Sequence, residues 1–416
     1  MWSADQVQPL RVTHVITRLI VGGAQENTIA TVLGLRTQPG FSATLLAGPT
    51  TGPEGSLESI VRAVPGLFIR LDPLVRPIVP WQDARAWRAL ARCFRQTQPH
   101  VVHTHSGKAG VLGRWAAHAA RVPVIVHTIH GPSFGPFQGP ISNILFRSAE
   151  RSAARVTTHF VVVADAMRTQ YLAAGIGRPD QYTRVPSGFD LDPFLAAATS
   201  TAWRSRFGFK PDHCVVGKIA RLFRHKGHDD LIAVMPALVR ACPAMRFLLV
   251  GDGVWRARFE RQVRDLGLAK HVVFAGLVPP ADVPHCVGAM DILVHLSRRE
   301  GLPRALPQAM AAGKPVVAFD CDGASEVCRD AETGFLVPPG DLRQLEERLI
   351  RLARDANLRH HLGSAGQTLV RREFGVDTMV LRLRELYLDL ARQAGLTGLP
   401  PVSTTNPPPA SFHPNP

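Results

Sequence analysis

The sequence has little cysteine, and none of it is arranged for metal or disulfide chemistry. Six cysteines are dispersed along 416 residues, without a C-x-x-C pair. This spacing excludes the usual zinc-binding motifs and provides no disulfide framework. A reducing, cytoplasmic location therefore fits the chain best.

No pattern in the sequence predicts a targeting segment or a membrane anchor. The first ten residues have no basic stretch followed by an apolar run, so they do not predict a secretory signal. The longest stretch without a charged residue, Val122 to Phe146, is interrupted by Pro132, Pro136 and Pro140. We therefore do not expect it to form a membrane-spanning helix.

Acidic residues are too few to balance the basic ones. The chain has 48 Lys and Arg residues against 33 Asp and Glu residues, which gives a formal net charge of +15. This balance predicts an anionic partner: nucleic acid, an anionic membrane surface or a phosphorylated small molecule. The length favours two domains, and the apolar content of 45% is that of a globular protein.

Strand-like runs alternate with helix-like segments through residues 1–190, which predicts a doubly wound parallel sheet in an N-terminal domain. Gly22 and Gly23 follow the first run, where they indicate either an ordinary turn or a loop that approaches a ligand closely. The expected strands are Val12–Thr17, Ala43–Gly48, Leu67–Leu71, His100–His103, Val124–Thr128 and Phe160–Ala164.

A second alternation of the same kind follows residues 191–211, which have the composition of an interdomain connection. It predicts a C-terminal α/β domain over 212–375. The expected strands are Val215–Ile219, Arg246–Val250, Val272–Ala275, Ile292–Leu296 and Val316–Phe319.

Histidines gather near the ends of two predicted strands in the first domain. His103 and His105 lie in the segment HTHSGKAG, and His127 and His130 lie around the next strand end. Their spacing, without an accompanying carboxylate, argues against a metal cluster. Structural or substrate-contacting roles are expected, because strand ends face the ligand side of an open α/β sheet.

One predicted helix, Trp81 to Gln96, is strongly amphipathic, with its arginines opposite Trp87, Leu90 and Phe94. Its cationic face is either simply solvated or a patch for anionic lipid headgroups. The four arginines of this face are Arg85, Arg88, Arg92 and Arg95.

Two loops of the second domain carry cations or glycines at strand ends. Arg221 and Lys226 follow the strand Val215–Ile219, and Gly251 and Asp252 follow the next strand. Such cations are usually just solvated, but their convergence at strand ends beside glycines makes a diphosphate site an equally good interpretation.

In a third stretch, Leu296 to Asp320, we expect a strand, a glycine-containing loop and an Ala-rich helix in that order. Glu300 lies in the loop, and the helix is expected to start at Gly301 and Leu302. An exposed helix start at a sheet edge attracts phosphate groups, because its N–H groups are unpaired and the helix dipole favours negative charge. Taken alone, the stretch is better explained as one more βα unit.

These motifs in this order resemble the family 4 glycosyltransferases over approximately Arg11 to Leu390. The resemblance rests on Gly22-Gly23, HTHSGKAG, His130-Gly131, PSGFD, IARLFRHKG, LVGDG, VVFAGLV, EGLPRALPQAMAAGKPVVAFD and GFLVPPGD. It implies a GT-B architecture, in which two Rossmann-like domains face each other across a cleft, and a helix over 376–396 that returns to the first domain. The uncharged, Pro-rich tail 397–416 is expected to be disordered.

The resemblance also implies retaining transfer of a hexose from a nucleotide sugar, here most simply a UDP-sugar, to a saccharide or lipid-linked acceptor, without a metal or other cofactor. In the family pattern Glu300 binds donor-sugar hydroxyls and His130 contacts the sugar near the reacting centre. Arg221 and Lys226 stabilise the departing diphosphate. The remaining donor or nucleotide contacts fall on Gly22, Gly23, Gly251, Asp252, Gly301, Leu302 and Gln308.

Gln308 departs from the family pattern, which has a second glutamate at this position to bind the ribose hydroxyls. An amide both donates and accepts hydrogen bonds, so Gln308 is expected to keep the role. Two other functions remain open, a nucleotide-sugar 2-epimerase of the same architecture and a noncatalytic nucleotide-sugar-binding protein. The expected location is cytoplasmic or peripheral at the inner face of the plasma membrane, and nucleic acid is disfavoured as a partner because no recognised binding module is present.

Overall fold

The computed structural model describes residues 8–52, 55–135, 137–197 and 200–400, which divide into two compact units. The first unit contains the residues up to Phe189 together with those from Val376 onward, and the second contains Asp190–Gly375. Of the predicted Pro-rich tail, residues 401–416 lie outside the described residues.

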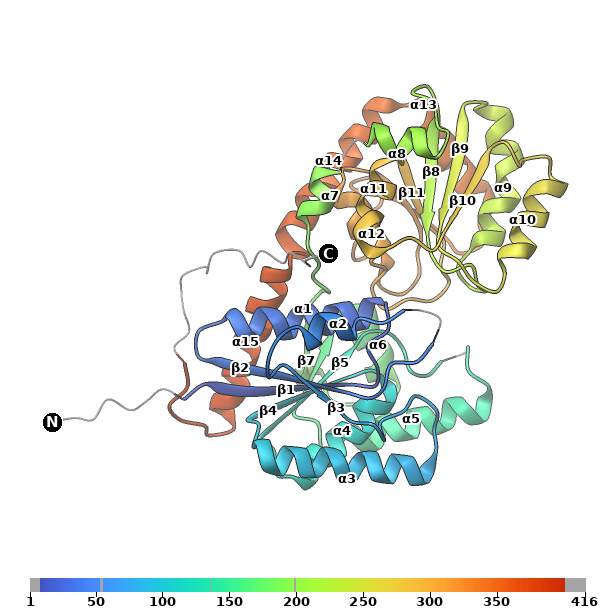
Figure 1. Ribbon diagram of the computed structural model, residues 1–416. Helices are drawn as coiled ribbons and strands as arrows, with labels where there is room; N and C mark the ends of the chain where they lie inside the picture. Colours follow the sequence, from blue (N-terminus) through green and yellow to red (C-terminus); the bar gives the residue numbers. More distant parts are fainter. Residues whose placement is uncertain (1–7, 53–54, 136, 198–199, 401–416) are drawn as a thin grey trace. The chain divides into compact units, whose positions relative to one another are not determined.

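The first unit is built on a parallel sheet of seven strands in the order β3-β2-β1-β4-β5-β6-β7 (Figure 1). The chain leaves the centre of this sheet in one direction and then in the other, so β1 and β4 form the point where the strand order reverses. The strands are β1 (Leu10–Ile16), β2 (Phe41–Ala47), β3 (Phe68–Arg70), β4 (Val101–His105), β5 (Val124–Ile129), β6 (His159–Val162) and β7 (Tyr182–Arg184).

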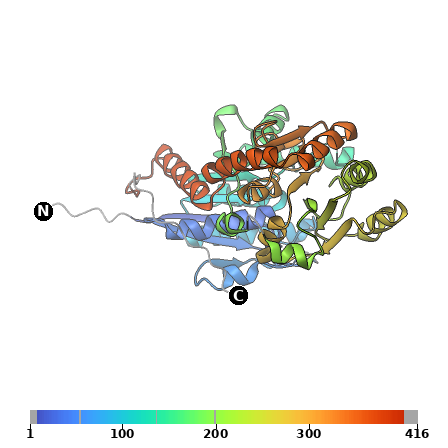
Figure 2. The same ribbon diagram turned by 90° about the horizontal axis from the view of Figure 1, so that it is seen from above.

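Helices cover both faces of the first sheet, as expected for parallel strands that are buried on both sides. On one face α4 packs between α3 and α5, and on the other α15 lies beside α1 (Figures 1 and 2). The helices are α1 (Gly23–Thr37), α2 (Glu58–Arg62), α3 (Pro80–Thr97), α4 (Gly107–Ala119), α5 (Pro140–Ala154), α6 (Asp165–Ala173), the 3-10 turn η1 (Pro179–Gln181) and α15 (Val376–Gln393).

Helix α15 completes the core of the first unit. Met379, Val380 and Leu383 are buried together with Val32 and Leu35 of α1. The two helices approach closely at Gly34 of α1, where an added Cβ would lie 2.5 Å from a methyl group of Val380. The predicted return of the last helix to the first sheet is therefore confirmed.

The second unit has a parallel sheet of six strands in the order β10-β9-β8-β11-β12-β13. Its reversal point lies between β8 and β11, which are hydrogen-bonded neighbours. The strands are β8 (Cys214–Ile219), β9 (Met245–Val250), β10 (Val272–Gly276), β11 (Ile292–His295), β12 (Val316–Phe319) and β13 (Gly334–Val337).

The helices of the second unit include those formed by the stretch 191–211 that the sequence suggested as a connection. This stretch lies within the second unit, where α7 and α8 pack against α11. The helices are α7 (Asp192–Ala196), α8 (Thr201–Arg206), α9 (His228–Ala241), α10 (Arg256–Asp265), α11 (Val283–Gly288), α12 (Ala305–Ala311), α13 (Leu342–Arg354) and α14 (Ala356–Glu373), with 3-10 turns η2 (Pro280–Asp282) and η3 (Asp322–Ala324).

The sequence-based strand predictions agree with the structure within a few residues, and two edge strands were missed. They are β7 and β13, which lie at sheet edges and have three and four residues. Within the described ranges, no helix combines the length and apolar character needed to cross a bilayer.

Candidate functional site

The predicted site residues fall at the carboxyl ends of strands in both units. Gly22, Gly23 and His130 belong to the first unit, and the other eight belong to the second. In the second unit, Lys226 follows β8 and Glu300 follows β11, so both are positioned by the two strands at the reversal point. Open α/β sheets bind ligands at such points.

Lys226 and Glu300 form an ion pair across the reversal point. The Lys226 Nζ atom lies 2.5 Å from Glu300 Oε1, and both side chains are about a quarter exposed, at 22% and 26%. The backbone N–H of Glu300 also donates to the carboxylate of Asp322, at 2.8 Å. Glu300 is therefore fixed by two contacts, and Lys226 is held against it.

The charge of Glu300 depends on this pairing. Burial alone would raise the pKa of Glu300, but the Lys226 ammonium holds it below its usual value. His295, at the end of β11, lies 3.7 Å from the same carboxylate oxygen. Burial lowers the pKa of His295 to about 3, so this ring is neutral near pH 7 and does not form a second ion pair.

A second lysine, Lys218 of β8, lies beneath this pair. It is 1% exposed, and within the described part of the chain its Nζ atom has no hydrogen-bond partner. Burial, with the nearby positive charge of Lys226, lowers the pKa of Lys218 to about 7. Sequence reasoning missed Lys218 and His295 because each lies in an otherwise apolar strand and carries no motif.

The loop after β8 packs tightly against the loop after β9. A Cβ at Gly251 would lie 2.3 Å from the carbonyl oxygen of Ala220, and Leu222 N donates to Asp252 O at 2.9 Å. The Asp252 carboxylate pairs with Arg256 at 3.0 Å. Gly251 and Asp252 therefore hold the two loops together. The nucleotide contacts expected of them stay predictions.

Arg221 lies in the same loop with an exposed side chain. Neither a hydrogen bond nor an ion pair holds its guanidinium to another residue in the ranges that the structure describes. The loop ends at Gly227, the N-cap of α9, with φ at +69°. A Cβ at Gly227 would lie 2.0 Å from the carbonyl oxygen of Leu296. Only glycine therefore allows the loop to approach the end of β11.

The expected helix start at Gly301 and Leu302 is wrong. Helix α12 begins at Ala305, with Arg304 as its N-cap, and spans only seven residues. Pro303 explains the difference, because proline disfavours helical geometry in the residue before it. Gly301 instead accepts a hydrogen bond from Gly323 N at 3.1 Å through its carbonyl oxygen.

Gln308 lies within α12 with a half-buried side chain. It is the fourth residue of this helix, and its ribose contact stays a prediction. In the first unit, Gly22 caps α1 and Gly23 begins it, which agrees with the predicted strand-to-helix turn.

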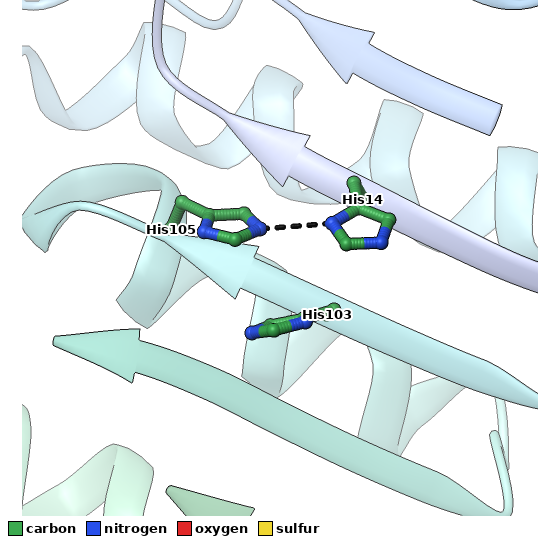
Figure 3. Close-up of side chains that lie close together, drawn as sticks. All are labelled: His14, His103 and His105. Atoms are coloured by element: carbon green, nitrogen blue, oxygen red, sulfur yellow. Dashed lines mark hydrogen bonds between the residues drawn. The ribbon is translucent and has the colours of Figure 1, made fainter. Parts of the chain in front are cut away.

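Four histidines of the first unit, His14, His103, His105 and His130, cluster at its own reversal point, and the first three are buried. His14 of β1 pairs in register with His103 of β4, and His105 ends the same strand (Figure 3). His14 Nδ1 lies 2.9 Å from His105 Nε2, and His105 Nδ1 lies 3.0 Å from His130 Nε2. The structure therefore connects the predicted catalytic His130 to two further imidazole rings.

His103 has a different set of partners. Its Nδ1 atom hydrogen-bonds the Tyr387 hydroxyl of α15, and its Nε2 atom lies 2.6 Å from Thr128 Oγ1. The sequence did not single out His14 or Tyr387. His14 is an isolated histidine in an apolar run, and only the pairing of β1 with β4 brings it to His103 and His105.

The amphipathic helix of the first unit has the predicted orientation. Leu90 and Phe94 of α3 are buried, and Trp87 packs at the edge of the same cluster. The arginines of the opposite face are all exposed: Arg85, Arg88, Arg92 and Arg95.

Comparison with known proteins assigns a family to both halves of the chain. Residues 21–193 match the family described as Glycosyltransferase Family 4, and residues 199–369 match Glycosyl transferases group 1. The chain is 30% identical over 284 residues to the GDP-mannose-dependent alpha-(1-6)-phosphatidylinositol monomannoside mannosyltransferase of Mycolicibacterium smegmatis, covering 66% of this chain and 72% of that protein.

Another relative aligns with nearly the whole chain. It is the UDP-Gal:alpha-D-GlcNAc-diphosphoundecaprenol alpha-1,3-galactosyltransferase of Escherichia coli, 25% identical over 388 residues, which are 92% of this chain and 97% of that protein. Among solved structures, Anabaena HepE in complex with UDP and glucose has a TM-score of 0.77 at 23% identity, over 91% of this chain and 100% of that chain. This last likeness concerns the fold alone. The chain belongs to the group 1 and family 4 glycosyltransferases, and it is a nucleotide-sugar-dependent glycosyltransferase with the GT-B fold.

Proposed function

We propose that the protein transfers a hexose from a UDP-sugar to a saccharide or lipid-linked acceptor, with retention of configuration and without a metal ion. The observation that carries this proposal is the Lys226–Glu300 pair at the β8/β11 reversal point, with the exposed Arg221 on the same loop as Lys226. Cations and a carboxylate at this position match the needs of a diphosphate and of sugar hydroxyls.

Departure of the nucleoside diphosphate places negative charge on its outer phosphate. Arg221 and Lys226 would stabilise that charge, a task for which other folds use magnesium. Lys226 is already held by Glu300 at 2.5 Å, so its ammonium is oriented before the donor binds. Glu300 would then accept hydrogen bonds from the sugar, and the departing phosphate would act as the base for the acceptor hydroxyl.

His130 and Gln308 complete the proposed donor contacts, to the sugar and to the ribose. A Gln308→Glu variant is expected to bind the nucleotide at least as tightly as wild type, because a carboxylate accepts stronger hydrogen bonds from a diol. Isothermal titration with the nucleoside diphosphate measures the affinity. Loss of turnover in Gln308→Glu with an intact fold would refute the ribose role.

The choice of donor is tested by thermal shift with UDP-, GDP- and ADP-sugars side by side, since a bound donor raises apparent stability by mass action. The Escherichia coli relative uses UDP-Gal and the Mycolicibacterium smegmatis relative uses GDP-mannose, so both nucleotides need testing. A UDP-sugar is expected to give the largest shift. Conversion of UDP-N-acetylglucosamine alone would indicate an epimerase, and binding without hydrolysis or transfer would indicate a noncatalytic protein.

Metal independence has a direct test of its own. Turnover is expected to be the same in excess EDTA and in millimolar magnesium, because the two cations of the β8 loop supply the positive charge. A Lys226→Met variant should lose turnover in both conditions. Activity that disappears with EDTA and returns with magnesium would refute this part of the proposal.

A cytoplasmic protein with a lipid-linked acceptor would work at the inner membrane face, and the first unit has a suitable surface. Ile141, Ile144 and Leu145 of α5 are 75%, 65% and 62% exposed, and α4 separates this helix from the cationic face of α3. Exposed apolar side chains and arginine clusters both favour contact with anionic bilayers. Nucleic acid is not a proposed partner.

Flotation with phosphatidylglycerol-containing vesicles tests the membrane contact. Neutralising the four α3 arginines with glutamine should reduce the bound fraction, whereas neutralising four exposed cations of the second unit should not, although both variants lose the same charge. Equal binding of the two variants and wild type would refute the contact. The control set is Arg261, Arg264, Lys270 and Arg371.

A further inference from the structure

Three imidazole rings of the first unit lie in a row that ends at His130. His14 and His105 are completely buried, with exposures of 0% and 1%. The ring centroids of both consecutive pairs are 5.2 Å apart, and the planes differ by only 13° for His14 and His105 and by 30° for His105 and His130. With nitrogen separations of 2.9 and 3.0 Å, both contacts are hydrogen bonds between ring nitrogens.

The two buried rings are neutral. Burial lowers the pKa of His14 to about 3, and burial, with the neighbouring histidines, lowers the pKa of His105 well below its usual range. A neutral imidazole has one N–H and one bare nitrogen. The central ring, His105, can therefore donate at only one nitrogen and must accept at the other, so the two hydrogen bonds point in the same direction along the row.

The far end of the row decides this direction. His14 Nε2 is buried and has no hydrogen-bond partner among the described residues. If the bonds ran from His130 toward His14, the proton of His14 would lie on Nε2 as a buried, orphaned N–H, which proteins tolerate less often than an unsatisfied acceptor. If they run toward His130, His14 donates from Nδ1 and leaves only a bare nitrogen unpaired.

The same rings are close enough to suggest a metal ion, since one nitrogen each of His14, His103 and His105 lie within 4.8 Å of one another (Figure 3). The hydrogen bonds argue against it. Both nitrogens of His103 are bonded, to Tyr387 and Thr128, and both nitrogens of His105 are bonded to other histidines. Of the six nitrogens, only His14 Nε2 is left without a partner in the described chain.

We infer that His14 and His105 are positioning residues that set the tautomer of His130, by donating along the row so that His130 accepts at Nε2 and carries its own proton on Nδ1. The tautomer of an imidazole is set by the hydrogen bond at its other nitrogen, and a histidine in the wrong tautomer is a poor catalyst even when its position is unchanged. This inference rests on the proposed contact of His130 with the donor sugar. It extends the site to β1 and β4.

An isosteric pair of substitutions at His105 tests the inference. Asn and Asp have the same shape and place a terminal atom near the position of His105 Nδ1, but Asn can donate to His130 whereas ionised Asp can only accept. His105→Asn should retain most of the turnover. His105→Asp should reduce kcat on the order of 100-fold, the size of a typical acid-base contribution, with little change in donor KM.

His103→Asn is the matched control, because His103 is buried in the same strand and stacks on His105, yet lies outside the hydrogen-bonded row. It should unfold more easily than wild type and keep its kcat. A His105→Asp variant with wild-type kcat would refute the inference. Equal losses of kcat in all three variants would also refute it, by reducing the cluster to a packing role.

Imidazole nitrogen-15 NMR on the full chain gives a readout that does not depend on activity. The His130 signals, identified by their loss in His130→Asn, should report the proton on Nδ1 in wild type and on Nε2 in His105→Asp. A wild-type proton on Nε2, or one equivalent of zinc that a chelator removes from this cluster, would overturn the inference. If His130→Asn keeps full turnover, the proposed catalytic role fails, while the NMR result still decides the direction of the row.

Discussion

Replacing Gly227 with alanine should damage the donor site through one backbone contact. Gly227 has a φ of +69°, and its Cβ would lie 2.0 Å from the carbonyl oxygen of Leu296 at the end of β11. The residue next to it, Lys226, holds Glu300. Either the β8 loop or the end of β11 must therefore move, and the ion pair moves with it.

Gly267 provides a control for the backbone strain. It has the same φ of +69°, follows α10 in the same unit, and has nothing within 4 Å of an added Cβ. Gly267→Ala should lower the unfolding free energy by about 1 kcal/mol. The left-handed conformation is unfavourable for alanine, and the reduced entropy of the unfolded chain offsets part of this cost. In Gly227→Ala, overpacking against Leu296 should lower the unfolding free energy by about 2 kcal/mol more, which gives a total loss of about 3 kcal/mol.

Thermal unfolding separates the two costs. For a unit of this size, 1 kcal/mol corresponds to about 2–4 °C, so Gly267→Ala should lower Tm by about 2–4 °C and Gly227→Ala by about 6–12 °C. Donor affinity, measured by titration calorimetry, should fall about tenfold or more in Gly227→Ala alone. Equal Tm losses in the two variants, with unchanged donor affinity in Gly227→Ala, would refute the reasoning.

Three further predictions concern the first unit. The unfolding free energy should decrease as the pH falls through 6.5, because burial lowers the pKa of His14 to about 3 and only the unfolded chain takes up its proton. His14→Gln should remove about 1.4 kcal/mol from the difference in unfolding free energy between pH 7.5 and pH 5.5, measured by urea titration, and an unchanged difference would contradict the assignment. Arg114→Met should lower the unfolding free energy by about 3–5 kcal/mol, because it leaves the buried Glu150 unpaired, while the double variant with Glu150→Leu should recover much of the loss; no recovery would argue against the pair. Tyr387→Phe should reduce stability by about 1 kcal/mol in urea denaturation by removing the hydroxyl bonded to His103, and an unchanged midpoint would show that this bond contributes nothing.

Both sheets could be predicted from the sequence because their central strands are continuous apolar runs between glycines and helical segments. β5 is buried at every position, and parallel strands of this kind have a strong local signal. The orientation of α3 followed from periodicity for the same reason. Local patterns were sufficient wherever a segment is long enough to repeat its period.

The contacts within the site could not be predicted in this way. Lys226 and Glu300 are 74 residues apart, and His14 and His105 are 91 residues apart, so each contact depends on which strands become neighbours. The predicted start of α12 was wrong for a local reason, because Pro303 keeps the residue before it out of helical geometry despite the Ala-rich sequence that follows. Side-chain pairing across strands requires the register, which no single segment encodes.

The place of α15 in the first unit has a consequence for synthesis of the chain. The apolar face of α1, with Val32 and Leu35, is covered by residues that leave the ribosome more than 300 positions later, as the separation between Asn27 and Met379 shows. The second unit is translated in full before α15 appears. The first unit to begin folding is therefore the last to be completed, and a chain that stops at Gly375 would leave that face of α1 open to aggregation.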